Sequence, residues 1–331
     1  MKKILAILVF SMFYLIRIPS AHTQVGMKKL GQSTMNFLKI GVSPKAAAMG
    51  NAYVSMGNDV ESVFYNPAGL AAITSGFNAF ASHTQWIADI NYTAGALAKS
   101  FGNFGTFAVS VLAVDYGDIQ GADLVSGTDA KGYVETGNID VGAYAFGLAY
   151  ARPISNRFSM GGQIQYVGQK LGDAEAATGM TENTINKLTF NFGIRFQTGV
   201  KDFTFAMAIR NFATQAKYEE VTAQLPLIFI VGSSIDLLQF FSNDSRDSFL
   251  ISAEFLHPNN YTERVNVGGQ YSFMGLVSLR AGYEFNRDLA GLSAGIGLGH
   301  TIGGKRMEIN YSYSDFDFFD GVNRLAVNIT F

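Results

Sequence analysis

The side chains that most often perform catalysis or bind metals are few in this chain and far apart. His22, His83, His257 and His300 are isolated, and none has the paired spacing with which histidines hold a metal ion. Ser252 precedes His257, but no local motif makes them a nucleophile and its base. The chain has no cysteine, which excludes disulfides, thiolate metal sites and a lipid-modified cysteine. We therefore expect no catalytic residue, no metal and no cofactor.

Two further patterns resemble ligand sites. The glycines of 295–299 alternate with apolar residues, but no strand–helix–strand unit surrounds them, so they do not form a nucleotide-binding loop. We interpret them as strand glycines that face the interior, where another segment comes close. The segment 315–321 carries three aspartates among phenylalanines. We interpret it as an exposed acidic loop, suited to contact with a partner or to weak cation binding.

The elements that carry these residues are strands. From about residue 76 onward, apolar and polar side chains alternate with a period of two, which is typical of strands with two unlike faces. In 324–331, for example, every second residue is a large apolar one. We predict strands at 76–86, 90–99, 104–114, 138–152, 156–169, 186–199, 201–211, 226–238, 246–257, 261–273, 276–287, 290–301, 304–315 and 322–331.

The connections between these strands indicate how they are arranged. Short turns follow most even-numbered strands, whereas the odd-numbered ones are followed by long polar stretches such as 115–137 and 170–185. Bacterial barrels alternate short periplasmic turns with longer extracellular loops in this way. Closure is required because lipid cannot satisfy an open sheet edge. We therefore predict an all-β membrane protein of the bacterial outer membrane, with 76–331 forming an antiparallel transmembrane β-barrel of about fourteen strands and both termini periplasmic.

Composition agrees with a sheet in contact with lipid. Hydrophobic residues make up 48% of the chain and charged residues 15%, against roughly 25% charged in a typical soluble domain. Aromatic residues near strand ends, including the single Trp86, fit interfacial girdles. The terminal Phe331 looks like the assembly signal of outer-membrane proteins. The net charge of −2 argues against a nucleic-acid partner.

The N-terminal residues follow a different pattern. Residues 1–23 combine two lysines, an apolar run and small residues, as in a cleaved signal peptide. Residues 24–75 precede the first strand and cannot lie in lipid as irregular backbone, so we predict a small helical plug (hatch) inside the barrel. A periplasmic tail is the alternative. Ser43 before Pro44 predicts the cap and first residue of a short helix.

The same segment contains a second cap-and-proline pair and a charged residue that needs a partner. Asn66 precedes Pro67, with Gly69 placed to end the turn. A buried charge is stable only when it is paired. We therefore predict that Lys45 pairs with Asp59 or with a lumen carboxylate. The candidates on the strands are Glu284 and Glu308.

Residues 37–71 resemble the signature of the PorV/PorQ family, within the wider group of FadL-like outer-membrane transporters. The resemblance rests on the element with Met49 and Gly50, then Asp59, then the Tyr-Asn-Pro-Ala-Gly-Leu-Ala run at 65–71. It implies a fourteen-stranded FadL-like barrel with an N-terminal hatch. For the best-known members it also implies a place in the type IX secretion system, binding C-terminal signal domains or the translocon.

Two functions follow from these interpretations, and neither is enzymatic. The first is an accessory of protein secretion, in which loops and plug bind secreted cargo or a translocon subunit. The second is a passive transporter of hydrophobic small molecules, whose plug gates a path through the lumen toward a lateral opening. Pro226, early in a predicted strand, is a candidate interruption of the wall because proline breaks ladder pairing. Outer-membrane lipid is the expected surrounding of both.

Overall fold

The computed structural model describes residues 33–124, 132–176, 179–218, 221–241, 246–287 and 291–331. The expected signal peptide at 1–23 lies outside this range. The strands of the main sheet are β1 (Phe77–Gln85), β2 (Asn91–Ser100), β3 (Thr106–Asp115), β6 (Val141–Pro153), β7 (Phe158–Ala176), β8 (Gly179–Gln197), β9 (Thr204–Phe212), β12 (Ile228–Asp236), β13 (Ser248–Pro258), β14 (Arg264–Phe273), β15 (Val277–Phe285), β16 (Leu292–Ile302), β17 (Lys305–Phe316) and β18 (Phe319–Thr330).

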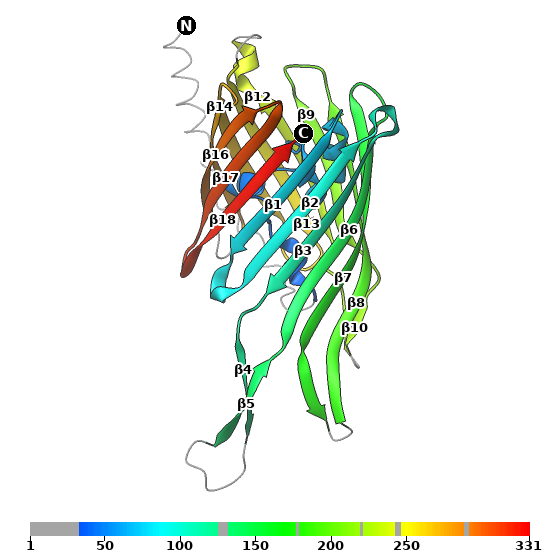
Figure 1. Ribbon diagram of the computed structural model, residues 1–331, viewed down its shortest axis with the longest axis vertical. Helices are drawn as coiled ribbons and strands as arrows, with labels where there is room; N and C mark the ends of the chain where they lie inside the picture. The colour runs from blue at the N-terminus through cyan, green and yellow to red at the C-terminus, as the bar shows by residue number, and fades with distance from the viewer. Residues whose placement is uncertain (1–32, 125–131, 177–178, 219–220, 242–245, 288–290) are drawn as a thin grey trace.

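These fourteen strands form a closed barrel (Figure 1). Each is antiparallel to its neighbours, and β1 pairs with β18 to complete the ring. The predicted fourteen-stranded barrel is thereby confirmed. Tight turns join strands at one end, as at Gly303 and Gly304 between β16 and β17. Both glycines have positive φ, as a two-residue hairpin turn of this kind requires.

Two of the long loops predicted from the sequence contain regular structure instead. Within 115–137, β4 (Ile119–Leu124) pairs with β5 (Tyr133–Ile139), and most of 170–185 belongs to β7 and β8. These hairpins extend from the end opposite the C-terminus (Figure 1). The alternating pattern disappears in β4 and β5 because nearly all of their residues are exposed on both faces, although the backbone still pairs. A smaller hairpin, β10 (Ala216–Tyr218) with β11 (Val221–Ala223), lies between β9 and β12.

The outer face of the wall is apolar. On β3 the residues alternate strictly between buried and exposed, and large apolar side chains occupy exposed positions around the barrel. Examples are Leu97, Phe107, Leu148, Phe192, Leu279 and Leu325. Such a band is stable only against lipid, and a closed ladder leaves no strand edge unpaired in it. Within the described residues, no helix is long and apolar enough to cross a membrane.

The N-terminal segment, defined here as residues 33–75, lies inside the ring of strands (Figure 1). It contains η1 (Asn36–Lys39), α2 (Pro44–Ala48), η2 (Val60–Phe64) and η3 (Pro67–Ala72). α2 contacts β15 to β18, whereas η3 contacts β3 and β6 to β8. The segment thus touches walls far apart around the ring. The helix predicted after Ser43 is present, but Gly69 does not end its turn, because η3 continues to Ala72.

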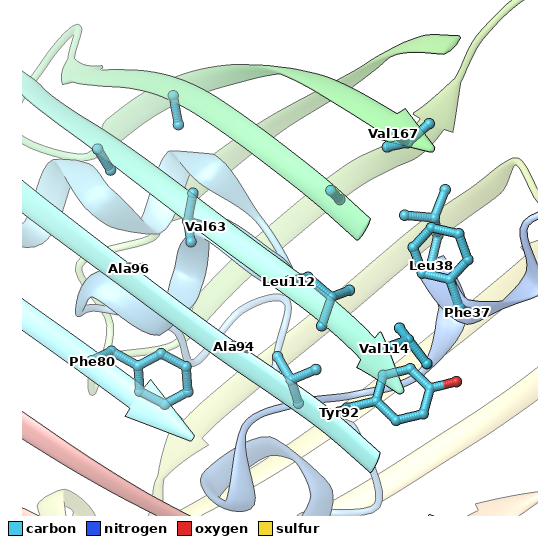
Figure 2. Packing of buried hydrophobic residues seen from close by; sticks show 14 of the residues in the cluster. Phe37, Leu38, Val63, Phe80, Tyr92, Ala94, Ala96, Leu112, Val114 and Val167 are labelled. Carbon is cyan, nitrogen blue, oxygen red and sulfur yellow. The ribbon is translucent and has the colours of Figure 1, made fainter. Parts of the chain in front are cut away.

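Small side chains on the inner wall make room for this segment. Figure 2 shows Phe37, Leu38 and Val63 of the N-terminal segment beside Ala94 and Leu112 of the wall. The inward positions of β2 and β6 are largely alanine, and β3 contributes one more: Ala94, Ala96, Ala98, Ala108, Ala143, Ala145, Ala149 and Ala151. Close packing of this kind is what protein interiors require. The inner wall and the segment therefore form one core.

Glycines mark the places where the segment's backbone meets the wall. A Cβ added to Gly282 would lie 2.0 Å from the carbonyl carbon of Met49, and one added to Gly268 would lie 2.3 Å from its oxygen. A Cβ on Gly295 would lie 2.6 Å from that of Ala48. The prediction that the glycines of 295–299 face the interior near another segment is confirmed at Gly295. Only glycine leaves enough space at these contacts.

We expect Gly268→Ala to displace the N-terminal segment, because its methyl group overlaps the Met49 carbonyl oxygen. Overpacking of a core costs about 1–3 kcal/mol. Gly269→Ala is the matched control, since its added carbon meets only ordinary contacts at 3.9 Å. The measurements are proteolysis of the segment in the folded barrel and the unfolding midpoint in detergent. Equal behaviour of the two variants would contradict this account.

Candidate functional site

Two sizeable cavities lie in the described part of the lumen, and the N-terminal segment lines part of both. The inner vestibule has a volume of about 360 Å³ and lies at the short-turn end, near Gly275, Arg306 and Thr330. The outer cavity has a volume of about 560 Å³ and lies at the long-loop end, near Ile87 and Tyr261. The segment therefore lies between two cavities at opposite ends of the barrel.

Lys45 is the centre of a buried charge cluster beside the inner vestibule. Its Nζ lies 2.9 Å from Oδ2 of Asp59, 3.1 Å from Oε1 of Glu61 and 3.3 Å from Oε2 of Glu308. The residue is only 7% exposed. Two of the predicted partners, Asp59 and Glu308, are therefore present together. Glu284 is not a partner, because it accepts a hydrogen bond from Asn51 and pairs with Arg287.

Further hydrogen bonds satisfy the carboxylates of this cluster. Glu61 is fully buried and accepts from the Ser43 hydroxyl and, at 2.6 Å, from Nδ2 of Asn328. Glu308 also pairs with Arg280 at 3.4 Å. Burial alone would lower the pKa of Lys45, but the carboxylates around it raise that pKa above its ordinary value. The lysine is therefore charged and joins the segment to the wall.

The remaining predicted residues of the segment shape its backbone and its contacts. The Ser43 hydroxyl accepts from the amide of Ala46, and Pro44 is the first residue of α2. Oδ1 of Asn66 accepts from the amide of Ala68. Its Nδ2 donates to the carbonyls of Val54, at 3.0 Å, and Ile194 of β8, at 3.2 Å. Asn66 thus caps a helix and also attaches it to the wall.

Close contacts with neighbouring backbone explain the small residues of the N-terminal segment. Gly50 donates its amide to the Ser293 hydroxyl at 3.1 Å, beside the contact of Met49 with the wall. Pro67 lies against Gly161, and Gly69 packs on the backbone of Gly57. Their role as a plug is taken up below as a proposal. The final residue, Phe331, donates its amide to the Phe77 carbonyl, and its role in assembly stays a prediction.

The outer cavity combines an apolar wall with charged ends. Ile228, Ile230 and Leu256 line it from β12 and β13. Ile87 lines it next to Trp86, whose ring packs on Phe316 and Tyr92 and under the guanidinium of Arg324. Trp86 therefore faces inward, and the prediction that it belongs to a lipid-facing girdle is wrong.

Other candidates from the sequence do not form a site. Ser252 faces the lumen, whereas His257 is exposed on the opposite face of β13 and contacts Glu263, so the two are not brought together. Among the described residues, no group of three or more histidine, aspartate or glutamate side chains is placed to hold a metal.

Pro226 precedes β12 and does not interrupt it. The three aspartates of 315–321 are exposed around a short turn between β17 and β18.

Several functional side chains were not singled out from the sequence. Arg280 and Glu254 occupy inward positions of alternating strands, where a charge between apolar neighbours indicates a side chain in the lumen. That signal was available for both residues. Glu61 gives no such signal, because it lies in a short 3₁₀ turn and its burial depends on the strands around it.

Comparison with known proteins supports the fold. No sequence-family profile and no curated protein match the chain. Among solved structures, the CymD monoaromatic hydrocarbon channel is similar with a TM-score of 0.57 and 12% identity, covering 88% of this chain and 98% of that one. The toluene transporter TbuX of Ralstonia pickettii is similar with a TM-score of 0.55 and 12% identity, covering 87% of this chain and 96% of that one. A FadL homologue of Pseudomonas aeruginosa is similar with a TM-score of 0.51 and 12% identity, covering 88% of this chain and 98% of that one.

These likenesses show a shared fold. They give no support to the finer resemblance to the PorV/PorQ family or to a type IX secretion role, which stay predictions. The closed ladder and the apolar outer face agree with a barrel that spans the outer membrane. The protein is a bacterial outer-membrane β-barrel with the FadL-like fold.

We expect Lys45→Gln to destabilise the protein strongly, because Asp59 and Glu61 would lose the cation that they share and Glu308 would keep only Arg280. Breaking a buried ion pair by removing one partner costs about 3–5 kcal/mol. The measurement is the unfolding midpoint in detergent, together with proteolysis of the N-terminal segment. Adding Glu61→Gln should recover part of the loss, since it removes one uncompensated charge.

Lys170→Gln is the control for this experiment. Lys170 pairs with Asp140 at 3.0 Å on the outer surface, where Asp140 is 78% exposed. An exposed pair contributes about 0–1 kcal/mol. We therefore expect a small change in the midpoint. If Lys45→Gln and Lys170→Gln gave equal midpoints, the buried cluster would not hold the segment to the wall.

Proposed function

We propose that the protein is a passive channel for hydrophobic small molecules across the outer membrane, in which residues 24–75 form a movable plug. The observation that carries this proposal is the outer cavity, an apolar-walled space inside the lumen at the long-loop end. Cavities that bind small molecules are typically apolar, with a few polar groups that orient the ligand. A solute arriving from outside reaches this cavity first.

Apolar contacts in the cavity favour the entry of such a solute. Ile228, Ile230 and Leu256 present a continuous apolar surface, because neighbouring strands place them beside one another. Removing apolar surface from water contributes roughly 25 cal/mol per Å². A hydrophobic molecule therefore gains free energy on leaving the external medium, and no energy source is needed for this step.

The path onward crosses the N-terminal segment. The ladder is closed all round the barrel, so the segment stands between the outer cavity and the inner vestibule. It is attached by noncovalent contacts such as the Lys45 cluster and the hydrogen bonds of Asn66. Such contacts can break and re-form, and we propose that a shift of the segment opens the path.

The similar structures support this choice of solute. CymD is a monoaromatic hydrocarbon channel, and TbuX is a toluene transporter. The present chain shares their fold over nearly the whole of their length. A channel for hydrophobic compounds is therefore favoured over an accessory of protein secretion, for which neither the cavities nor the similar structures supply an observation.

A disulfide between the segment and the wall tests the movable plug. The hydroxyls of Ser55 and Ser252 lie 3.4 Å apart, and both residues are fully buried. The chain has no cysteine of its own, so Ser55→Cys with Ser252→Cys creates a single possible bridge. Uptake of radiolabelled toluene and decanoate is measured in host cells that lack their own channel for such compounds. We expect oxidation to reduce uptake to the level of cells without the protein, and reduction to restore it.

The two single-cysteine variants are the controls, and oxidation should leave their uptake unchanged. Equal uptake by the oxidised and reduced double variant would contradict the movable plug. Failure of the unmodified protein to raise uptake of either compound would contradict the channel itself. The two parts of the proposal therefore fail separately.

A further inference from the structure

The wall of the outer cavity is arranged in levels along the strands. At the deep level, Asn266 of β14 is paired with Glu254 of β13 on one side and with Glu284 of β15 on the other. Two residues farther out on β13 lies the apolar Leu256, whose neighbour on β12 is Ile230. The cavity is thus polar at its base and apolar above it.

The base contains a polar atom without a partner. Asn266 is 1% exposed, and its Oδ1 has no hydrogen-bond partner within the part of the chain that the structure describes. The flanking carboxylates already accept hydrogen bonds, Glu254 from the Val54 amide and Glu284 from Asn51. A buried acceptor left unsatisfied costs about 1–3 kcal/mol. A hydroxyl or N–H group of a ligand placed at the base would satisfy Asn266.

The outer part of the cavity carries an excess of positive charge. Lys39, Arg210, Arg264 and Arg287 line it, against two carboxylates at the base, Glu254 and Glu284. Burial and the neighbouring guanidinium groups of Arg264 and Arg287 lower the pKa of Lys39 to about 8. Within the described residues no ion pair joins Lys39 to a carboxylate. An anionic group placed there would be stabilised.

We propose that the outer cavity binds an amphipathic organic acid that carries a hydroxyl or amide N–H at the far end from its carboxylate. The carboxylate lies among Lys39, Arg264 and Arg287, the apolar body lies along Ile230 and Leu256, and the donor group reaches Asn266. This inference rests on the proposed function, because it names the solute class of the same cavity. The proposed ligand differs from a neutral hydrocarbon because it needs a polar group at each end.

The dimensions of the cavity fit such a molecule. From Glu254 at the base to Pro258 at the outer end, four residues of β13 span about 13 Å at 3.3 Å per residue. An extended medium-length chain has this reach, with one polar group at each end. ω-Hydroxydecanoate is therefore a suitable probe. Decanoate lacks the terminal hydroxyl, and decanol lacks the carboxylate, so each removes one of the two polar contacts.

The test measures binding of these probes by titration calorimetry to the full-length barrel in lipid nanodiscs, with empty nanodiscs subtracted. We expect ω-hydroxydecanoate to bind at least tenfold more tightly than decanoate and decanol. Asn266→Ala should abolish the preference for ω-hydroxydecanoate over decanoate and leave decanoate binding unchanged. Lys39→Gln should weaken the binding of both acids by about tenfold and leave decanol binding unchanged.

Lys217→Gln is the matched control, because it removes the same charge from the exposed hairpin strand β10, outside the cavity. It should change none of the affinities. Equal affinity for all three probes, or a preference that survives Asn266→Ala, would overturn the inference. A channel that transports toluene and decanoate without this preference would leave the proposed function intact. Tight binding without uptake in cells would contradict the channel but not the site.

Discussion

Closure of the backbone hydrogen-bond ladder is the constraint on which the rest of the structure depends. Within lipid, an unpaired strand edge would leave several amides and carbonyls without partners, each at a cost of several kcal/mol. The pairing of β1 with β18, from Asn78 opposite Thr330 to Gln85 opposite Asn323, removes that edge. Because the ring is closed and has fourteen strands, its outside must be apolar and its inside must be filled or wet.

The filling of the lumen explains features that would look unrelated in the sequence. Alanines on the inner faces of β2, β3 and β6 leave room for the 3₁₀ helices, and glycines on β14 and β15 allow the Met49 backbone to approach. The Lys45 cluster then joins the segment to β17 through Glu308. Apolar packing, close backbone contact and a buried ion cluster therefore divide the lumen into two chemically different cavities, one polar and one apolar-walled.

Much of the fold could be predicted from the sequence, because lipid on one side and the lumen on the other impose a period of two on each strand. The strand count and the inward position of Glu308 were predictable in this way, whereas Asp59 and Glu308 were predicted as partners of Lys45 because a buried charge must be paired. The outer hairpins were missed because water on both faces removes that period. Glu61 and the inward-facing Trp86 were missed because their surroundings come from strands distant in the chain, which local pattern does not report.

The distance along the chain between contacting residues has a consequence for assembly. The carbonyl of Gly41 accepts from Arg324 of β18, 283 residues later, and Glu61 accepts from Asn328, 267 residues later. The N-terminal segment is synthesised first, yet its partners are synthesised last. Contacts of such high sequence separation form only after the entropy of closing a very long loop has been lost. The segment therefore reaches its final position late in folding, when the last strand joins the first.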